Sequence, residues 1–344
     1  MSASKTKPRD RNPTETTSDA LADESTSEPE VQAEFGLYYT LKQVQRDATA
    51  RYGFYLIVFV SAVALFVTID TYLSTLTFGR VDDFAIAEAL PVLHHPETGP
   101  LDYETWQPPV WHPDGTWEYP LGTDQAGRDY LTRVIYGTRV SVTTGFVATL
   151  LGAAGGTTVG AVAGYYGGWV DELLMRGVEI LYAIPPLVLV IVFTVFASGG
   201  DPDIGYAMLG VGIVSIPVFA RIIRSRVLSV REMAYVEAAR AAGVRDRTII
   251  RRHVIPNSIS PVVVYATLQI GFAILTVAGL SFLGYGAQPP TADWGEMLQR
   301  AQGQMNSNVW VSIWPGLAIL LTVMGFNLLG DGLQDALDPR IDND

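Results

Sequence analysis

Long apolar stretches recur from residue 52 onward, and polar segments separate them. A helix needs about 20 mainly apolar residues to cross the roughly 30 Å hydrocarbon core of a bilayer. Five stretches clearly meet this requirement: residues 52–69, 140–165, 180–197, 261–283 and 309–329. A sixth, residues 204–223, is interrupted by glycine and proline but has no charged residue before Arg221. The pattern predicts an all-α integral membrane protein with six transmembrane helices.

Small residues and prolines interrupt the apolar pattern inside these predicted spans. Gly152, Gly156 and Gly160 recur at a spacing that lets two helices approach closely within the bilayer. Pro185 and Pro186 should break or kink the third span, because proline lacks the N–H of a helical hydrogen bond. We interpret both features as helix packing rather than as contacts to a solute.

The basic residues lie mainly on one side of the predicted membrane. If the N-terminus is cytoplasmic, 18 of the 23 lysines and arginines lie in cytoplasmic segments and 5 lie outside. Cytoplasmic loops of membrane proteins carry an excess of lysine and arginine. The N-terminus is therefore predicted to be cytoplasmic.

This topology divides the chain into segments with different expected roles. Residues 1–34 are rich in Ser, Thr, Asp and Glu and hold too little apolar surface to offset the entropy of folding, so we expect a disordered acidic cytoplasmic tail. The other segments are 35–69 with the N-terminal segment and first transmembrane helix, 70–139 as an extracellular loop, 140–330 as the transmembrane core with a cytoplasmic loop at 221–260, and 331–344 as the cytoplasmic C-terminus.

The composition disfavours several classes of protein. The formal net charge of −12 disfavours nucleic acid as a partner. The chain has no cysteine, and its four histidines offer no spacing typical of a tightly held metal. We therefore expect no metal or cofactor in this chain. Only three of the 23 basic residues are lysine, and scarce lysine with abundant acid is a bias that we expect of an organism living at high salt.

Residues that would power transport or catalyse a reaction do not occur in the expected patterns. A phosphate-binding P-loop needs Gly-Lys followed by Ser or Thr, but the three lysines follow Ser4, Thr6 and Leu41. Four of the predicted spans contain no Asp, Glu or Lys, whereas proton-coupled carriers usually need ionisable groups at membrane depth. Neither a carboxylate pair nor a nucleophile with its base lies within a span. We expect this chain not to be an enzyme.

The arginine-rich cytoplasmic loop, residues 221–260, predicts two short helices joined by a glycine hinge. Residues 232–242 favour a helix, and Gly243 suits the left-handed position just beyond its end. Asp246 can cap a second helix that ends before Pro256. Alanines give the first helix a thin profile that can enter a groove. We interpret the loop as a docking element for a partner protein; the alternative is an amphipathic helix lying on the membrane.

The same loop carries a recognisable motif. The run Glu-Ala-Ala at residues 237–239, with a glycine six residues after the glutamate and Pro256 further on, resembles the EAA loop of ABC importer permeases. In that family the loop forms a coupling helix that sits on the ATPase subunit. The resemblance implies that Pro256 directs the loop back into the fifth span. It assigns coupling to the ATPase to Glu237, Ala238, Ala239, Arg240 and Gly243.

Three further stretches, residues 121–139, 280–298 and 327–339, resemble the dipeptide, oligopeptide and nickel branch of these permeases. The resemblance runs from about residue 36 to 340, with small departures at Thr132, Tyr285 and Gln334. The matching positions for which we expect structural roles are Gly122, Asp124, Gly127, Arg128, Asp129, Gly284, Pro289, Trp294, Gly330 and Asp331.

The resemblance implies the fold of a type I ABC importer permease and the place of the second, C-type permease in a complex. The expected partners are a homologous permease, two ATPase subunits that bind the ATP, an extracellular lipid-anchored solute-binding protein, and membrane lipid. The chain would form the pathway for di- and oligopeptides across the cell membrane. The resemblance, together with the high-salt composition, leads us to expect a halophilic archaeon as the source. Import of nickel, glutathione or sugars stays open, as does a stand-alone channel or secondary carrier whose basic loop anchors anionic lipid.

Overall fold

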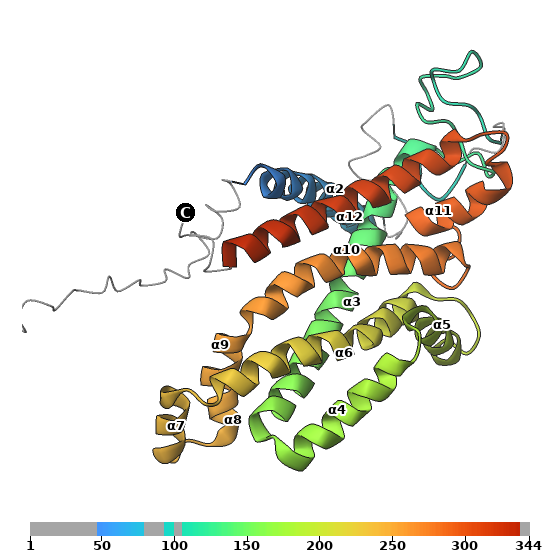
Figure 1. Ribbon diagram of the computed structural model, residues 1–344. Coiled ribbons are helices and arrows are strands. Elements are labelled where there is room, and N and C mark those ends of the chain that lie inside the picture. Colours follow the sequence, from blue (N-terminus) through green and yellow to red (C-terminus); the bar gives the residue numbers. More distant parts are fainter. Residues whose placement is uncertain (1–46, 79–92, 100–104, 338–344) are drawn as a thin grey trace, which may run out of the picture. The chain divides into compact units, whose positions relative to one another are not determined.

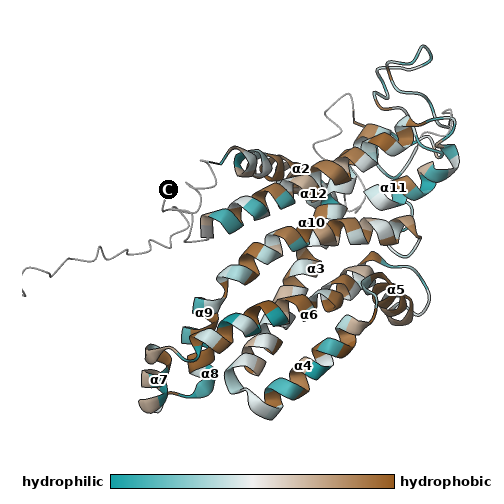
Figure 2. Cartoon of the chain, in the orientation of Figure 1, coloured by the Kyte–Doolittle hydropathy of each residue, from teal (hydrophilic) through white to brown (hydrophobic). Residues whose placement is uncertain are grey.

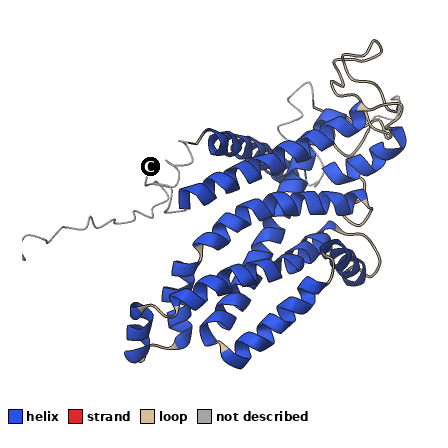
Figure 3. Cartoon of the chain, viewed as in Figure 1, coloured by secondary structure: helices blue, strands red, loops and turns tan. Residues whose placement is uncertain are grey.

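The computed structural model describes residues 47–78, 93–99 and 105–337. Within these residues the regular secondary structure is helical, and an isolated bridge between Thr123 and Asp129 is their only β pairing (Figure 3). The predicted acidic tail, residues 1–34, lies outside the described residues. So do parts of the 70–139 loop and the last seven residues of the chain.

Seven helices of twelve or more residues make up most of the described chain (Figures 1 and 2). They are α2 (Ala48–Phe78), α3 (Tyr130–Tyr166), α4 (Gly168–Ala183), α5 (Pro186–Ala197), α6 (Ile204–Val230), α10 (Ser260–Phe282) and α12 (Trp310–Leu337). The shorter elements are α7 (Ala234–Ala241), α8 (Asp246–Ile249), the π-helix η2 (Ile250–Val254), α9 (Ile255–Ser258), α11 (Trp294–Ala301) and the 3-10 helix η3 (Gln302–Gln304).

Most of the long helices have the length and composition of membrane spans. Among the described helices, α2, α3, α6, α10 and α12 are each long and apolar enough to cross a bilayer. The pair α4 and α5 meets the same criterion together, with a bend of 94° between the two, and counting the pair as one span gives six. The prediction of an all-α protein with several membrane spans is confirmed.

The third span begins earlier in the chain than the apolar pattern predicts. α4 begins at Gly168, whereas the apolar stretch begins at residue 180, because the first turns of α4 carry charged residues. One of these, Asp171, accepts two hydrogen bonds of 2.6 Å from the guanidinium of Arg224 on α6. The predicted break is present, since Pro186 has no N–H with which to continue α4.

The packing of α3 against α6 is too close for large side chains at the contact. Gly152, Gly156 and Gly160 of α3 face α6, and a methyl group built on any of them would lie less than 3.0 Å from an α6 atom. At Gly160 the nearest of these atoms is the carbonyl oxygen of Ala220, which belongs to the α6 backbone. Small residues permit such backbone approach in membranes, so this run serves helix packing, as the sequence predicts.

α3 is also the helix against which most of the other long helices pack. It contacts α2, α4, α10 and α12 in addition to α6, and α12 lies between α2 and α10 (Figure 1). The packing of these helices therefore holds both ends of α3 in place within the described part of the chain. Both ends contribute to the sites below.

We expect Gly160→Ala to destabilise the protein by about 1–3 kcal/mol, because the added methyl group can be accommodated only by moving the α6 backbone. The measurement is thermal unfolding of the purified chain in detergent. The matched control is Gly177→Ala on α4, where an added methyl group meets no atom within 4 Å and should leave stability unchanged or slightly raised. Equal melting temperatures for the two variants would contradict the close α3–α6 contact.

Candidate functional site

The loop between α6 and α10 folds into a compact helical structure at one end of α6 (Figure 1). α7 is shorter than the predicted helix at 232–242, and Glu237 and Ala238 are exposed on it. Gly243 follows α7 with a φ of 75°, the left-handed conformation that glycine adopts without strain. The predicted hinge conformation is therefore present, and one face of α7 is open to a partner.

The second half of this loop differs from the sequence prediction. Arg245 occupies the N-cap position of α8 and makes no capping hydrogen bond through its side chain, while Asp246 is the first residue of the helix. Helical backbone then continues through α9, so Pro256 lies inside a helix instead of after its end. The predicted cap and helix end are both wrong. Pro256 cannot donate an α-helical hydrogen bond, and the wider π turn of η2 directly before α9 accommodates this missing donor.

Apolar side chains fasten the loop to the long helices. Val236 of α7, Ile249 of α8 and Val254 of η2 are fully buried. They form one core cluster with Tyr165 of α3, Val227 of α6 and neighbouring residues. Burying side chains of this size contributes about 1.5–3 kcal/mol each. The loop is therefore a packed extension of α3 and α6.

Near the start of α3 lies a cluster of charged side chains, here called the charged hub, made of the buried Asp124, Arg128, Arg133 and Glu296 and the partly exposed Arg300. Arg133 is 1% exposed, and its guanidinium lies 2.9 Å from the carboxylate of Glu296 on α11 and 3.5 Å from that of Asp124. Arg128 donates to Asp124 over 2.7 Å from Nε. Glu296, itself fully buried, also pairs with Arg300. Each carboxylate thus meets two arginines, which offsets the cost of burying them.

The hub also ties two loops to α3 through backbone carbonyls and shapes the turn before α3 through backbone N–H groups. Arg133 donates to the carbonyl oxygens of Pro96 at 2.9 Å and Pro290 at 3.0 Å. Asp124 accepts from the backbone N–H of Ala126 and Arg128, which shapes the turn that precedes α3. Segments far apart in the sequence therefore meet at one arginine.

Most of the predicted motif positions lie in or beside this hub. Gly122 and Gly127 have φ of 82° and 71°, which the turn before α3 requires. Asp129 is the N-cap of α3 and accepts hydrogen bonds of 3.2 Å from the N–H groups of Leu131 and Thr132. Burial raises the pKa of Asp129 above its usual range, while these hydrogen bonds oppose the rise. The turn is thus a capped helix start rather than an open solute site.

The motif positions that follow α10 in the chain also lie near the start of α3. Gly284, with a φ of 87°, follows α10, and the chain then passes Pro289 on its way to α11. Trp294 is 2% exposed and donates from Nε1 to the carbonyl of Val134 over 2.8 Å. Asp293 caps α11, and burial raises its pKa. These residues hold α11 on α3.

The two motif positions on α12 lie elsewhere. Gly330 packs on α10, where an added methyl group would overlap Leu268. Asp331 is exposed. The structure therefore brings the positions around α3 and α11 together, and it does not bring Gly330 and Asp331 to the hub.

Arg133 and Glu296, the centre of the hub, are not among the motif positions that the sequence predicts to have structural roles. Both lie inside the motif stretches, but they are 163 positions apart in the chain.

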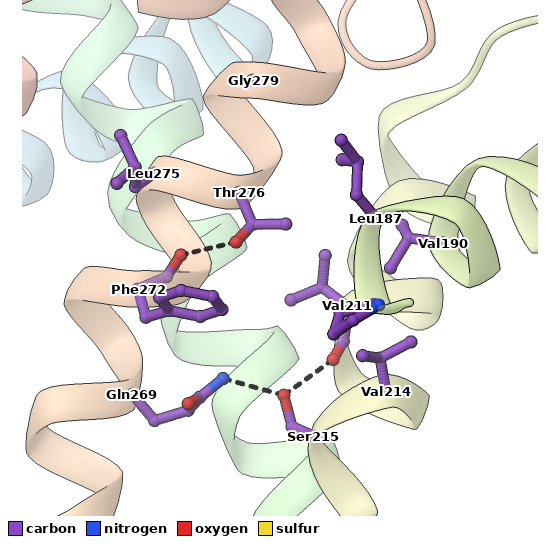
Figure 4. Close-up of a pocket in the computed structure, with 11 residues that line it drawn as sticks. Leu187, Val190, Val211, Val214, Ser215, Gln269, Phe272, Leu275, Thr276 and Gly279 are labelled. Carbon is purple, nitrogen blue, oxygen red and sulfur yellow. Dashed lines mark hydrogen bonds between the residues drawn. The ribbon is translucent and has the colours of Figure 1, made fainter. Parts of the chain in front are cut away.

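A pocket of about 340 Å³ lies between α5, α6 and α10 (Figure 4). Its walls are mainly apolar, with Leu187 and Val190 from α5 and Phe272 from α10. On its floor Gln269 donates to Ser215 Oγ over 2.8 Å, and Ser215 donates to the carbonyl of Val211. An apolar pocket with a few placed polar groups suits a small solute or a side chain. No group of three metal-binding side chains occurs among the described residues.

Glu296→Gln should cost about 3 kcal/mol of stability, because it removes a charge that faces two arginines in a buried site. Chemical or thermal unfolding of the purified variant in detergent measures the loss. Glu172→Gln on α4 is the matched control, since the Glu172–Arg176 pair is exposed and its loss should cost about 0–1 kcal/mol. A Glu296 variant as stable as the control would show that the hub contributes no stability.

Comparison with known proteins gives a consistent set of relatives. Residues 156–343 match the family model described as a binding-protein-dependent transport system inner membrane component. The glutathione transport system permease protein of Pectobacterium atrosepticum is 46% identical over 221 residues, which are 64% of this chain and 72% of that protein. The dipeptide transport system permease protein of Haemophilus influenzae is 44% identical over 234 residues, 68% of this chain and 78% of that protein. Among solved structures, the methionine ABC transporter MetNI in an inward-facing crystal form aligns with a TM-score of 0.49 and 20% identity, covering 60% of this chain and 98% of that one.

Proposed function

Since the chain belongs to the family of binding-protein-dependent transport system inner membrane components, we propose that it is a permease subunit of an importer that separate ATPase subunits power. It is a multi-pass protein of the cell membrane. In this proposal the ATPase subunits bind and hydrolyse ATP. This chain forms part of the translocation pathway and the mechanical link between that pathway and the ATPase subunits. The chain itself then catalyses no reaction.

The observation that carries the proposal is the packed loop between α6 and α10. We call residues 231–259 the coupling loop. Its three buried aliphatic side chains fix it to α3 and α6, while Glu237 and Ala238 remain exposed on α7. When a partner displaces a surface that is exposed yet rigidly attached to two spans, the displacement also moves those membrane helices. A loop serving only as a lipid anchor would not need this attachment.

The complete complex is proposed to hold two ATPases, a second homologous permease and an extracellular lipid-anchored solute-binding protein. In this arrangement the chain takes the second, C-type position. Glu237, Ala238, Ala239, Arg240 and Gly243 form the contact with the ATPase. Scarce lysine and a net charge of −12 support the further proposal that the complex works at high salt, in a halophilic archaeon.

The proposed solute is a short peptide. Relatives with 44–46% identity are named as dipeptide and glutathione transport proteins, and glutathione is itself a small peptide. The pocket between α5, α6 and α10 supports this proposal, because its volume suits a small solute and its mainly apolar lining includes the amide of Gln269 and the hydroxyl of Ser215, which are hydrogen-bonded to each other. Nickel and sugars are the alternatives within the same machinery, and a stand-alone channel or carrier is the alternative outside it.

Glu237→Lys should remove the ATPases from the complex, because it reverses a charge on the exposed face of α7. The measurement is a pull-down of the tagged chain from detergent-solubilised membranes at native salt, with mass spectrometry of the proteins that co-purify. We expect the native chain to bring down an ATPase pair and a homologous permease, and the variant to bring down about tenfold less ATPase.

The matched control is Asp201→Lys, the same type of charge reversal at an exposed residue in the turn between α5 and α6. It should leave ATPase recovery unchanged. Recovery of the native chain alone, as a stable homo-oligomer, would favour the channel or carrier. Equal ATPase recovery with both variants would remove Glu237 from the contact.

Uptake of a labelled dipeptide by cells that express the whole importer tests the solute. An excess of unlabelled di- or tripeptide should compete, whereas nickel or a sugar should not. Uptake of labelled glutathione without uptake of the dipeptide would narrow the solute to glutathione. Uptake of labelled nickel or of a labelled sugar in place of the dipeptide would contradict the peptide assignment and leave the importer assignment in place.

A further inference from the structure

We propose that Tyr165, near the end of α3, is the positioning residue that holds both helical parts of the coupling loop and transmits their movement to α3. This inference rests on the proposed function, because the movement that Tyr165 would transmit is the one that the ATPase subunits impose on the coupling loop. The position of the loop itself can be tested without any partner.

Tyr165 is the side chain at which the two halves of the loop meet. It is 5% exposed, and its hydroxyl donates to Oδ1 of Asp246, the first residue of α8, over 2.7 Å. The guanidinium carbon of Arg240 on α7 lies 5.4 Å from the centre of the Tyr165 ring. The contact with Tyr165 also raises the pKa of the Arg240 guanidinium above its ordinary value. A single phenol thus contacts α7 on one side of the Gly243 hinge and α8 on the other.

Hydrogen bonds define the position of the coupling loop on α3 more narrowly than apolar packing does. Val236, Ile249 and Val254 bury the base of the loop, but burial of apolar surface is not directional. A hydrogen bond has a narrow range of distances and angles, so the Tyr165–Asp246 bond sets the position of α8 on α3. Nearby, Arg231 at the end of α6 donates to the carbonyl of Gly164 over 2.8 Å. The end of α3 is therefore the point at which the loop is held in register.

α3 is suited to carry movement away from this point. It has 37 residues, about 55 Å of helix, and its other end is held by Arg133 in the charged hub. Along its length the glycine contact with α6 leaves no free space for bending toward that helix. A displacement of the coupling loop through Tyr165 would therefore move α3 as a rigid body, as packed helices move in hinge and shear transitions.

The first test measures how often the loop leaves its place. The native chain has no cysteine, so Val236→Cys introduces a single reporter in the buried base of α7. Its rate of reaction with a maleimide in lipid nanodiscs reports the open fraction of the loop. Adding Tyr165→Phe, which keeps the ring and removes the hydroxyl, should raise that rate about tenfold, the effect of losing one hydrogen bond to a charged group.

Tyr166→Phe is the matched control, because it makes the same chemical change at the next residue, whose side chain is 50% exposed. It should leave the reaction rate unchanged. Asp246→Ala should raise the rate, and combining it with Tyr165→Phe should raise it no further, because each change removes the same hydrogen bond. An unchanged rate in Tyr165→Phe, or full additivity of the two changes, would overturn the positioning role.

The second test measures transmission in the assembled complex. Tyr165→Phe should leave the recovery of ATPases unchanged and lower the amount of solute imported per ATP hydrolysed. If the loop opens more often in this variant but import per ATP is unchanged, the transmission role is wrong. If the native chain brings down no ATPase, the proposed function fails, while the maleimide rates still decide whether Tyr165 positions the loop.

Discussion

The close contact between α3 and α6 is the constraint on which the rest of the structure depends. Glycines let the two helix backbones meet, and an added methyl group at Gly156 or Gly160 would overlap α6. In a bilayer no hydrophobic force drives helices together, so packing contacts of this kind hold them. Once the two helices are locked, the end of α3 and the end of α6 lie side by side, and the coupling loop can be packed on both.

The two ends of α3 use different chemistry because they meet different requirements. At the start of α3, Arg133 binds two loops through the carbonyl oxygens of Pro96 and Pro290. It also binds α11 through the carboxylate of Glu296. Such an arrangement is costly to break, since any partner removed leaves a buried charge. At its end α3 meets a helical loop that buries three aliphatic side chains, and single hydrogen bonds made by Tyr165 and Arg231 add to this packing. The contact at this end is therefore mainly apolar.

The sequence predicts the fold class well, because membrane spans depend on local composition. The apolar stretches locate α2, α3, α6, α10 and α12, and the double proline locates the bend before α5. The start of α4 is missed, because its first turn carries a charged residue, Asp171, whose partner Arg224 is distant in sequence. The same reason hides the charged hub and the pocket between α5, α6 and α10, both of which depend on pairings across the whole core.

The coupling loop shows where local rules give a wrong answer for a physical reason. Asp246 has the chemistry of a cap, and a capping aspartate would bond the backbone of its own helix. In the structure its carboxylate accepts from Tyr165 instead, so the side chain joins α8 to a different helix. Pro256 likewise favours a helix end, yet helical backbone continues past it to Ser258, directly after the π turn of η2. The first departure attaches α8 to α3 and the second leads the chain through α9 toward α10, so the loop is attached to two spans. In the proposed mechanism, this attachment carries a displacement of α7 to the membrane helices.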